Sequence, residues 1–220
     1  MISRRLRIAS EYLKGFNYLA DCGTDHGILP IYAVEKNYVK KAIASDNKNK
    51  PLIQAKDNIA KKGLIGKVNA VFADGLSYLY VEKDIDIVSI LGLGGRTIID
   101  ILKEADLINV KRLVLSANSQ NYELRKFLEN IRWKIISEEF IKENNKYYQI
   151  IVSEKGRMSL TELEREFGPL LIKNQNKIFK ERLLSMIKQL KIAKEKAKNK
   201  TTKEKIVNKI KFLEEVLTWI

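Results

Sequence analysis

The stretch Tyr18–Pro30, YLADCGTDHGILP, decides the fold of this chain. Its apolar first residues, up to Asp21, predict a short buried strand. A glycine between two acidic residues then predicts a tight turn, and a helical pattern from about Gly27 to Lys36 follows with no polar linker. We expect this strand, turn and helix to bring backbone N–H groups and a helix N-terminus to the carboxyl end of a parallel strand. That is where α/β proteins bind nucleotide-like ligands.

The composition is that of a soluble globular protein, with 220 residues of which 45% are hydrophobic and 31% charged. This length suits one domain with an appendage, or two small domains. No run approaches the ~20 apolar residues that a membrane span needs, and the N-terminus lacks the apolar core of a signal peptide. Cys22 is the only cysteine and His26 the only histidine. We therefore expect a cytoplasmic protein, not bound to a membrane, with no disulfide framework and no metal.

The net charge of +14 indicates a polyanionic partner, either a nucleic acid or an anionic lipid surface. Residues 157–220 hold 16 Lys and Arg against 8 Asp and Glu, whereas residues 1–156 hold 25 against 19, so the charge density is higher in the C-terminal part. A Lys-, Asn- and Ile-rich composition can also reflect nucleotide bias in the gene, which adds lysines without any partner. Both interpretations remain open at this point.

Strand and helix patterns alternate five times, which predicts a doubly wound parallel sheet with helices on both faces. After the first unit, the predicted strands are KAIASD (41–46), VNAVFAD (68–74), DIVSILGLGG (86–95) and RLVLSAN (112–118). The helices that follow are expected at about 51–62, 97–103 and 122–130, and a further helix, capped by Ser3 and closed by Gly15, precedes the first strand.

The pattern changes after the fifth unit. WKIISEEFI (133–141) and KYYQIIVSEK (146–155) are two strand-like runs with only a short turn between them, which predicts a β-hairpin. Five parallel units followed by a terminal hairpin resemble the seven-stranded, Rossmann-like sheet of class I S-adenosylmethionine-dependent methyltransferases. A dinucleotide-binding Rossmann fold would continue with parallel strands. We place this domain at residues 1–156.

The remaining residues, 157–220, predict a C-terminal helical domain. A short helix breaks at Gly168-Pro169, and two apolar series with alternating spacings of three and four residues follow, which is the pattern of coiled-coil seams. Thr201 and Glu204 have the spacing of a capping box, so we expect the chain to turn there and the two helices to pair antiparallel. The series are Phe179, Leu183, Met186, Leu190, Ala193 and Ala197, then Ile206, Ile210, Leu213, Leu217 and Ile220.

Three acidic residues end the first three strands, and together with Gly23 they indicate a cofactor that contains a nucleoside. Asp21, or a water that it holds, would lie near a methionine ammonium. Asp46 would accept hydrogen bonds from both ribose hydroxyls. Asp74 would accept from the adenine amino group while the Ala73 N–H faces the ring.

Other nucleotide sites fit this sequence poorly. A dinucleotide site needs G-x-G-x-x-G after the first strand and a phosphate loop needs G-x-x-x-x-G-K-[ST], and neither is present. The extra carboxylate of Asp25 would repel a pyrophosphate, but it suits a cofactor that carries a sulfonium and an ammonium. His26 either points at this ligand or caps the helix.

These residues resemble a known family. DCGTDHGILP, ILGLGG after the fourth strand, SAN after the fifth and a C-terminal helical hairpin are similar to the bacterial tRNA (adenine-22-N1)-methyltransferases of the TrmK type. The resemblance covers essentially the whole chain. It implies methyl transfer from S-adenosylmethionine to N1 of an adenine in the D-arm region of tRNA.

The chemistry of this transfer suggests which residues form the sites. Asn118 is the nearest side-chain acceptor for the target base and Gly94 would let backbone approach it, although such glycines can also serve tight packing alone. Arg4, Arg5, Arg7 and Arg96 would contact RNA, although the first three could equally form a solvated helix face. The residues assigned to the cofactor are Asp21, Gly23, Thr24, Asp25, His26, Asp46, Asn47, Ala73, Asp74, Gly75 and Gly92.

Two rival functions remain compatible with the sequence: a methyltransferase that acts on a small molecule or protein, and a non-catalytic RNA-binding protein. An exocyclic-amine methyltransferase is disfavoured because N-P-P-[YF] is absent. Cytosine-C5 methylation is disfavoured because the sole cysteine lies in the first strand. We expect a monomer.

Overall fold

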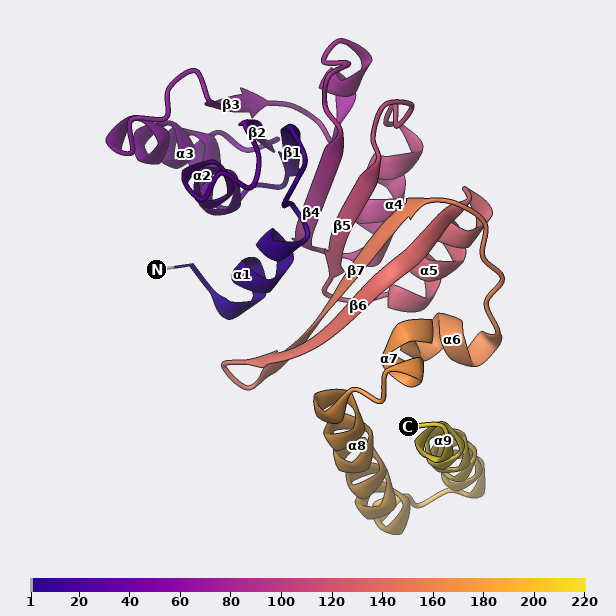
Figure 1. Cartoon of the computed structure of the whole chain (residues 1–220). Coiled ribbons are helices and arrows are strands. Elements are labelled where there is room, and N and C mark those ends of the chain that lie inside the picture. The colour runs from indigo at the N-terminus through magenta and orange to yellow at the C-terminus, as the bar shows by residue number, and fades with distance from the viewer. Residues whose placement is uncertain (1) are drawn as a thin grey trace.

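A seven-stranded sheet forms the body of the molecule, in a computed structural model that describes residues 2–220. The strand order is β3-β2-β1-β4-β5-β7-β6 (Figure 1). The first five strands are parallel, β7 is antiparallel to β5, and β6 is antiparallel to β7. The strands are β1 (Tyr18–Cys22), β2 (Lys41–Asp46), β3 (Val68–Phe72), β4 (Ile87–Leu93), β5 (Arg112–Ala117), β6 (Trp133–Glu143) and β7 (Lys146–Lys155).

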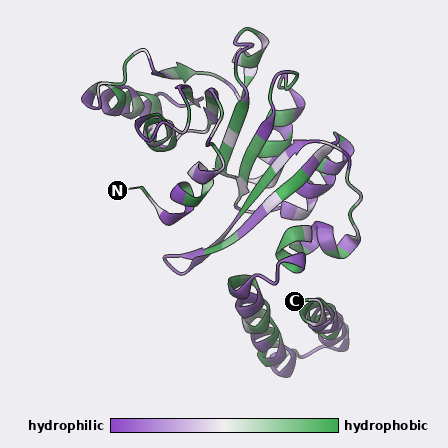
Figure 2. Cartoon of the chain, in the orientation of Figure 1, coloured by the Kyte–Doolittle hydropathy of each residue, from purple (hydrophilic) through white to green (hydrophobic). Residues whose placement is uncertain are grey.

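Helices cover both faces of this sheet, because the apolar residues of the parallel strands are buried on both sides. One apolar cluster lies between the sheet and α4 and α5, and a second lies beneath α1 and α2; Figure 2 shows the apolar central strands. The helices of this part are α1 (Arg4–Glu11), α2 (Ile28–Glu35), α3 (Asn49–Lys61), the 3₁₀ turn η1 (Ser77–Tyr80), α4 (Gly95–Lys103) and α5 (Asn121–Asn130).

The terminal hairpin confirms the predicted class of fold. Asn144 and Asn145 connect β6 to β7 with φ angles of 48° and 60°, the left-handed conformation that tight hairpin turns require and that asparagine tolerates. The predicted strand boundaries shift by three residues or fewer, and the alternation of parallel units followed by an antiparallel pair is as expected.

Helix α1 is anchored to this hairpin. The Ser3 hydroxyl caps the helix by accepting from the Leu6 N–H at 3.2 Å, as predicted. The Arg4 N–H donates to the Glu143 carboxylate, and the Tyr12 hydroxyl donates to Glu139 at 2.7 Å. Burial, with this contact, raises the pKa of Tyr12 to about 12, so the hydroxyl remains a donor at neutral pH.

Two short helices and two long helices follow the sheet. The break at Gly168 and Pro169 is present as predicted, because Pro169 begins a new helix. Figure 1 shows α8 and α9 side by side below the sheet, joined by a short turn. The four helices are α6 (Glu162–Phe167), α7 (Pro169–Lys173), α8 (Lys177–Lys196) and α9 (Lys200–Thr218).

The seam between α8 and α9 agrees with the predicted series in its inner half and differs elsewhere. Leu183 and Leu213 are buried, but Ala193 near the turn is exposed, and Ile187 and Val216, outside both series, are buried. The predicted capping box is wrong. Asn199 caps α9, its side chain accepting from the Thr202 N–H at 2.7 Å, since the helix begins at Lys200.

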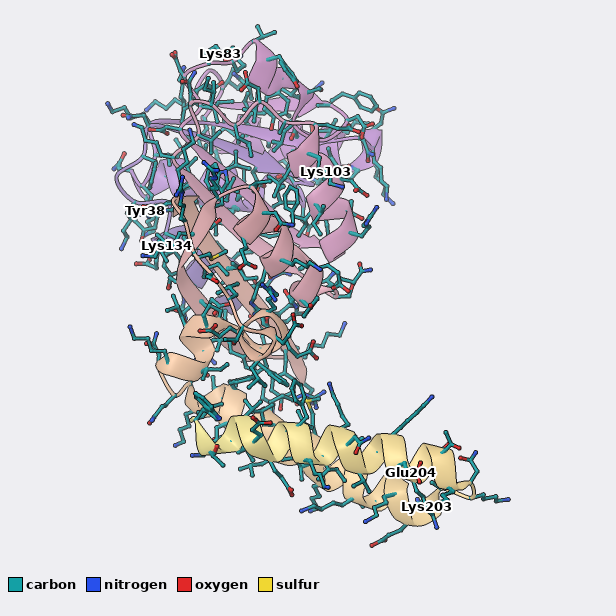
Figure 3. The ribbon with its side chains drawn as sticks, turned by 90° about the vertical axis from the view of Figure 1, so that its right-hand side faces the viewer. Tyr38, Lys83, Lys103, Lys134, Lys203 and Glu204 are labelled. Carbon is teal, nitrogen blue, oxygen red and sulfur yellow. The ribbon has the colours of Figure 1, made fainter. Side chains whose placement is uncertain are left out.

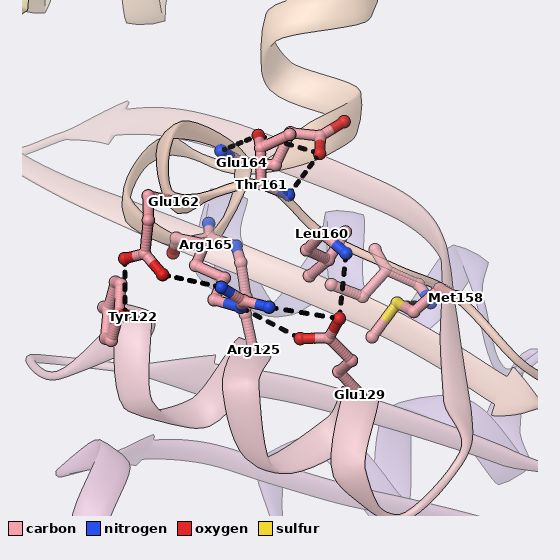
Figure 4. Close-up of polar contacts among 10 residues, drawn as sticks. Tyr122, Arg125, Glu129, Met158, Leu160, Thr161, Glu162, Glu164 and Arg165 are labelled. Atoms are coloured by element: carbon pink, nitrogen blue, oxygen red, sulfur yellow. Dashed lines mark hydrogen bonds and ion pairs between the residues drawn. The ribbon is translucent and has the colours of Figure 1, made fainter.

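Polar contacts fasten the first C-terminal helices to the sheet domain. Arg165 of α6 pairs with Glu129 of α5 at 2.9 Å and with Glu162, which accepts from Tyr122 (Figure 4). The hydrogen bond from Arg165 lowers the pKa of Glu129. Beyond this joint, α8 and α9 extend as an arm with Lys203 and Glu204 near its end (Figure 3).

Candidate functional site

A pocket of 470 Å³ lies at the carboxyl edge of β1, β2 and β3. The turn after β1 forms one wall, the segment after β2 another, and the segment after β3 together with α4 closes it. Its lining residues are Cys22, Gly23, Thr24, Asp25, Asp46, Asn47, Lys48, Pro51, Ala73, Asp74, Gly75, Leu93, Thr97 and Ile101.

Three carboxylates line this pocket, from the ends of three neighbouring strands. Asp25 and Asp74 are exposed, and Asp46 is half-buried, with one carboxylate oxygen accepting from the Lys48 N–H at 2.9 Å. Parallel strands end at the same edge of a sheet, so acidic residues that are about 20 to 30 positions apart in the chain converge here. The pocket therefore favours a ligand that carries positive charge and hydroxyl donors.

The structure brings together eight of the eleven residues assigned to the cofactor. They are Gly23, Thr24, Asp25, Asp46, Asn47, Ala73, Asp74 and Gly75. Asp21, His26 and Gly92 do not line the pocket. All three are next to lining residues in the chain, but which residues face the pocket depends on strand pleat and packing.

Asp21 is buried beneath the pocket instead of lining it. It is 5% exposed, and its carboxylate accepts from the Ser89 hydroxyl of β4 at 2.6 Å. Burial raises the pKa of Asp21 to about 6, since the charged form loses its hydration. A cation bound above it would favour the charged form.

Several backbone groups that we expected to face the ligand are paired within the protein. The N–H groups of Gly23 and Thr24 both donate to the Ser45 carbonyl oxygen at 2.9 Å. The Ala73 N–H, expected to face the adenine ring, donates to the Asp46 carbonyl oxygen at 3.2 Å. These bonds hold the three strand ends together, so the donors in this part of the pocket are not free.

The turn at Gly23 packs closely against Leu93. Gly23 has a φ of +72°, and a Cβ atom there would lie 3.3 Å from a Leu93 methyl carbon. Among the described residues, the buried Thr24 hydroxyl has no hydrogen-bond partner. Three carboxylates beside this turn fit a nucleoside cofactor with a cationic amino-acid tail.

His26 neither lines the pocket nor caps the helix. Its Nε2 lies 3.2 Å from an Asp25 carboxylate oxygen, and Gly27 is the N-cap of α2 with no side-chain hydrogen bond. Cys22 lines the pocket, but burial raises the pKa of its thiol to about 12, so it is not a nucleophile at neutral pH.

Sequence reasoning missed six lining residues. Leu93, Thr97 and Ile101 reach the pocket from β4 and α4 because α4 begins directly after the strand. Helical spacing of four between Thr97 and Ile101 was the available signal. The other three are Cys22, Lys48 and Pro51.

The candidate catalytic residues directly follow the next two strands, β4 and β5. The Asn118 amide nitrogen donates to the Gly92 carbonyl oxygen at 2.6 Å, which leaves the amide oxygen as an acceptor. Gly94 is the N-cap of α4. Packing explains the glycine after it, since a Cβ atom at Gly95 would lie 2.5 Å from the Gln120 carbonyl oxygen.

The four candidate RNA-binding arginines differ in environment. Arg4 and Arg7 are exposed on α1, whereas Arg5 is half-buried. Arg96 is exposed in the first turn of α4 and lies 3.4 Å from Asp100. The Arg5 guanidinium lies against Gly92, and Arg96 directly follows Gly95, so both arginines lie at the glycine cluster that ends β4.

The protein-family comparison matches residues 19–215 to TrmK, described as tRNA (adenine(22)-N(1))-methyltransferase. The chain belongs to the TrmK family. The resemblance seen in the sequence is thereby confirmed. The match runs from β1 into α9, so it includes the pocket and most of the helical arm.

Individual TrmK relatives agree over their whole lengths. The tRNA (adenine(22)-N(1))-methyltransferase of Bacillus subtilis is 29% identical, over 98% of this chain and 97% of its own. The structure of Mycoplasma capricolum TrmK with S-adenosyl-homocysteine superposes with a TM-score of 0.90 at 32% identity, covering 100% of this chain and 99% of that one. The structure of Streptococcus pneumoniae Sp1610 with S-adenosyl-L-methionine superposes with a TM-score of 0.90 at 33% identity, covering 99% of this chain and 100% of that one.

Proposed function

We propose that this TrmK-family protein transfers a methyl group from S-adenosyl-L-methionine to N1 of adenine 22 in the D-arm region of tRNA. The observation that carries this function is the pocket with three carboxylates at the carboxyl edge of the sheet, in a chain that matches the family from β1 to α9. A TrmK relative of known structure binds the same cofactor.

We assign each pocket carboxylate to a different part of the cofactor. Asp46 would accept from the ribose hydroxyls, Asp74 from the adenine amino group, and Asp25 would face the cationic end. Asp21, beneath the turn, would add negative potential below the ammonium. The bound cofactor supplies a methyl group activated by the sulfonium charge.

Adenine N1 needs little chemical activation because its lone pair is available in the neutral ring. The protein must align N1 with the methyl group and exclude water. We assign the Asn118 amide oxygen to accept a hydrogen bond from the N6 amino group, since its nitrogen is already bound to Gly92. Gly94 would let the backbone approach the base.

N1 lies on the Watson–Crick edge, so the target adenine must leave its stack before it reaches the site. We propose that Arg4, Arg7 and Arg96 and the basic arm contact the tRNA backbone. Lysines line a groove of 510 Å³ between α8 and α9, which suits recognition of RNA by shape and phosphate. These are Lys191, Lys194, Lys203 and Lys211.

We propose that residues 1–156 carry catalysis, that residues 157–220 form the tRNA-binding domain, and that the protein acts as a cytoplasmic monomer. The apolar faces of α8 and α9 pack against each other and onto Phe140 of β6, which supports a monomer. Within residues 2–220, no helix is long and apolar enough to cross a bilayer. Light scattering during gel filtration measures the oligomeric state directly.

The decisive experiment is transfer of a labelled methyl group to unmodified tRNA, compared with the same tRNA that carries guanine at position 22. We expect labelling of the first tRNA, at N1 of the adenine, and none of the second. Equal labelling of the guanine variant would contradict the proposed target. Labelling of a small molecule or protein alone would favour another methyltransferase, and cofactor binding without transfer would favour a non-catalytic RNA-binding protein.

A further inference from the structure

The side chain of Arg5 lies at the carboxyl edge of the sheet, beside the candidate catalytic strand ends. A Cβ atom built on Gly92 would lie 3.3 Å from one terminal nitrogen of Arg5 and 3.5 Å from the other. The guanidinium carbon also lies 4.8 Å from the centre of the Tyr148 ring. Arg5 therefore rests between the end of β4 and the aromatic face of a β7 residue.

This position belongs to the substrate side of the site. Strand β7 pairs antiparallel with β5, with Ile151 opposite Leu115, so lower-numbered residues of β7 lie toward the carboxyl end of β5. That register brings Tyr148 to the edge where β5 ends and Asn118 follows. Asn118 donates to Gly92, the residue on which Arg5 rests.

The helix that carries Arg5 holds it in place. Ser3 caps the helix, the Arg4 N–H donates to Glu143, and Tyr12 donates to Glu139. Both ends of α1 are thus attached to the hairpin that contains Tyr148. The guanidinium is positioned before any ligand arrives, which reduces the entropy lost on binding.

The donors of Arg5 are unused. Within residues 2–220, its guanidinium makes no hydrogen bond or ion pair, although the residue is half-buried. Buried Arg125 donates to Glu138 and Gln149, and half-buried Arg112 donates to Glu154. Among residues 2–220, half-buried Arg182 resembles Arg5 in lying over a tyrosine ring without such a bond, but it is on α8 and not at this edge of the sheet. A half-buried cation with free donors at this edge is suited to an anion.

We propose that Arg5 binds a backbone phosphate next to the target adenine and that Tyr148 is the positioning residue that orients its guanidinium. This inference rests on the proposed function and adds where the flipped nucleotide is held. A phosphate is preferred over the base itself because methylation makes the adenine ring cationic, and an arginine against the ring would oppose that charge. A guanidinium matches two phosphate oxygens through parallel hydrogen bonds.

The test pairs Arg5→Gln with tRNAs in which one phosphate beside adenine 22, on the 5′ or the 3′ side, is replaced by a neutral methylphosphonate. Both the single-turnover methylation rate and the tRNA dissociation constant are measured. For the wild type we expect one of the two replacements to lower rate or affinity about 10- to 100-fold, as loss of a charged hydrogen-bonded contact does. Arg5→Gln should show a similar loss on normal tRNA and no further loss on that methylphosphonate tRNA.

The proposal would be overturned if the losses from Arg5→Gln and from the methylphosphonate multiplied when combined. It would also be overturned if Arg5→Gln had the rate and affinity of the wild type on normal tRNA. Tyr148→Ala should lower the methylation rate or tRNA affinity by part of the loss seen in Arg5→Gln. Tyr148→Phe should behave like the wild type, because the ring face and not the hydroxyl contacts Arg5. Equal loss in both Tyr148 variants would remove the positioning role. Lys40→Gln, which removes one exposed charge at the opposite edge of the sheet, is the matched control and should change neither quantity.

The proposed function and the role of Arg5 fail separately. If the wild type does not methylate adenine 22, the proposed function is wrong. The coupling between Arg5 and the phosphate is then still decided by the dissociation constants. Cofactor affinity and melting temperature of each variant show whether it is folded, and both should match those of the wild type.

Discussion

The acidic pocket at the sheet edge and the helical arm carry opposite charge and are built differently. The pocket has three carboxylates at the ends of neighbouring strands, whereas the groove of the arm contains four lysines with two glutamates. The pocket depends on strand order and register, so its residues come from separate parts of the sequence. The arm depends on one helical seam, so its charges follow locally from the sequence.

The difference shows how one protein can bind two ligands of opposite charge. In the proposed function, the cationic cofactor binds where carboxylates converge on the sheet edge, and the polyanionic RNA binds an extended basic surface. The joint formed by α5, α6 and β6 separates the two. Substitutions in the pocket, in the arm or in the joint should therefore affect different ligands.

The largest effect is expected from the joint, where Arg125 and Glu138 form a fully buried ion pair at 2.9 Å. Arg125 also donates to the carbonyl oxygens of Arg165 and Glu166 at the end of α6. Arg125→Met leaves the Glu138 carboxylate buried and unpaired. We expect a loss of about 3–5 kcal/mol in the free energy of unfolding, measured by urea denaturation.

The control for this prediction is the double variant Arg125→Met/Glu138→Leu, which removes both charges. It should recover much of the stability, because no uncompensated charge remains. A double variant no more stable than Arg125→Met would show that the other hydrogen bonds of the joint, not the charge pair, carry its stability.

Asp21→Asn should change how stability depends on pH. The pKa of Asp21 is raised from 3.8 to about 6 in the folded protein, so the charged form opposes folding. The Asp21 charge should not lower the free energy of unfolding below pH ~4. Its cost should grow as the pH rises to ~6 and then stay at about 3 kcal/mol. Asparagine keeps the shape and an acceptor for Ser89 but not the charge.

The measurement is the difference in unfolding free energy between Asp21→Asn and the wild type, without cofactor, at pH 4 and pH 7. The unfolding free energy of Asp21→Asn should rise relative to that of the wild type as the pH rises. A difference that stays constant over this range would mean that Asp21 does not titrate with the raised pKa.

Asp46→Ala should weaken cofactor binding about 10- to 100-fold, since it removes a charged acceptor for two ribose hydroxyls. The unfolding free energy and tRNA affinity should change little. Isothermal titration calorimetry with S-adenosyl-L-methionine measures the effect. Asp84→Ala, at an exposed carboxylate outside the pocket, is the control, and unchanged affinity in Asp46→Ala would disprove the ribose assignment.

The smallest effect is expected from Lys194→Gln/Lys203→Gln/Lys211→Gln in the groove of the arm. Affinity for tRNA should fall about tenfold near physiological salt, and the salt dependence of binding should become shallower, because fewer counterions are released. Cofactor affinity should be unchanged. An unchanged salt slope would show that the groove does not contact RNA and that the lysines reflect composition.

Much of the fold could be predicted because its signals are local. The alternation of strands and helices, the break at Gly168-Pro169 and the Ser3 cap each depend on neighbouring residues. The wrong capping residue of α9 illustrates the limit. Thr201 and Asn199 are both acceptable caps, and in the structure the helix starts at Lys200 with Asn199 as its cap.

For the candidate site, the sequence predicted many of the lining residues but few of the contacts between them. Glycine and aspartate at strand ends marked eight lining residues, but the sequence did not show that the Ala73 N–H pairs with Asp46 or that Asp21 is buried against Ser89. Leu93 was also missed as a pocket residue. Such contacts join strands that are distant in the chain, so only their register reveals them.

The sequence by itself determined the parallel sheet with its terminal hairpin, the acidic strand ends and the TrmK resemblance, because periodicity, turn residues and motifs are properties of neighbouring residues. Only the tertiary structure decided which carboxylates face the pocket and which is buried, and only it placed Arg5 of the first helix on Gly92 and Tyr148. The physical reason is that side-chain direction and environment depend on the packing of segments far apart in the chain. For Arg5, these segments are α1, β4 and β7.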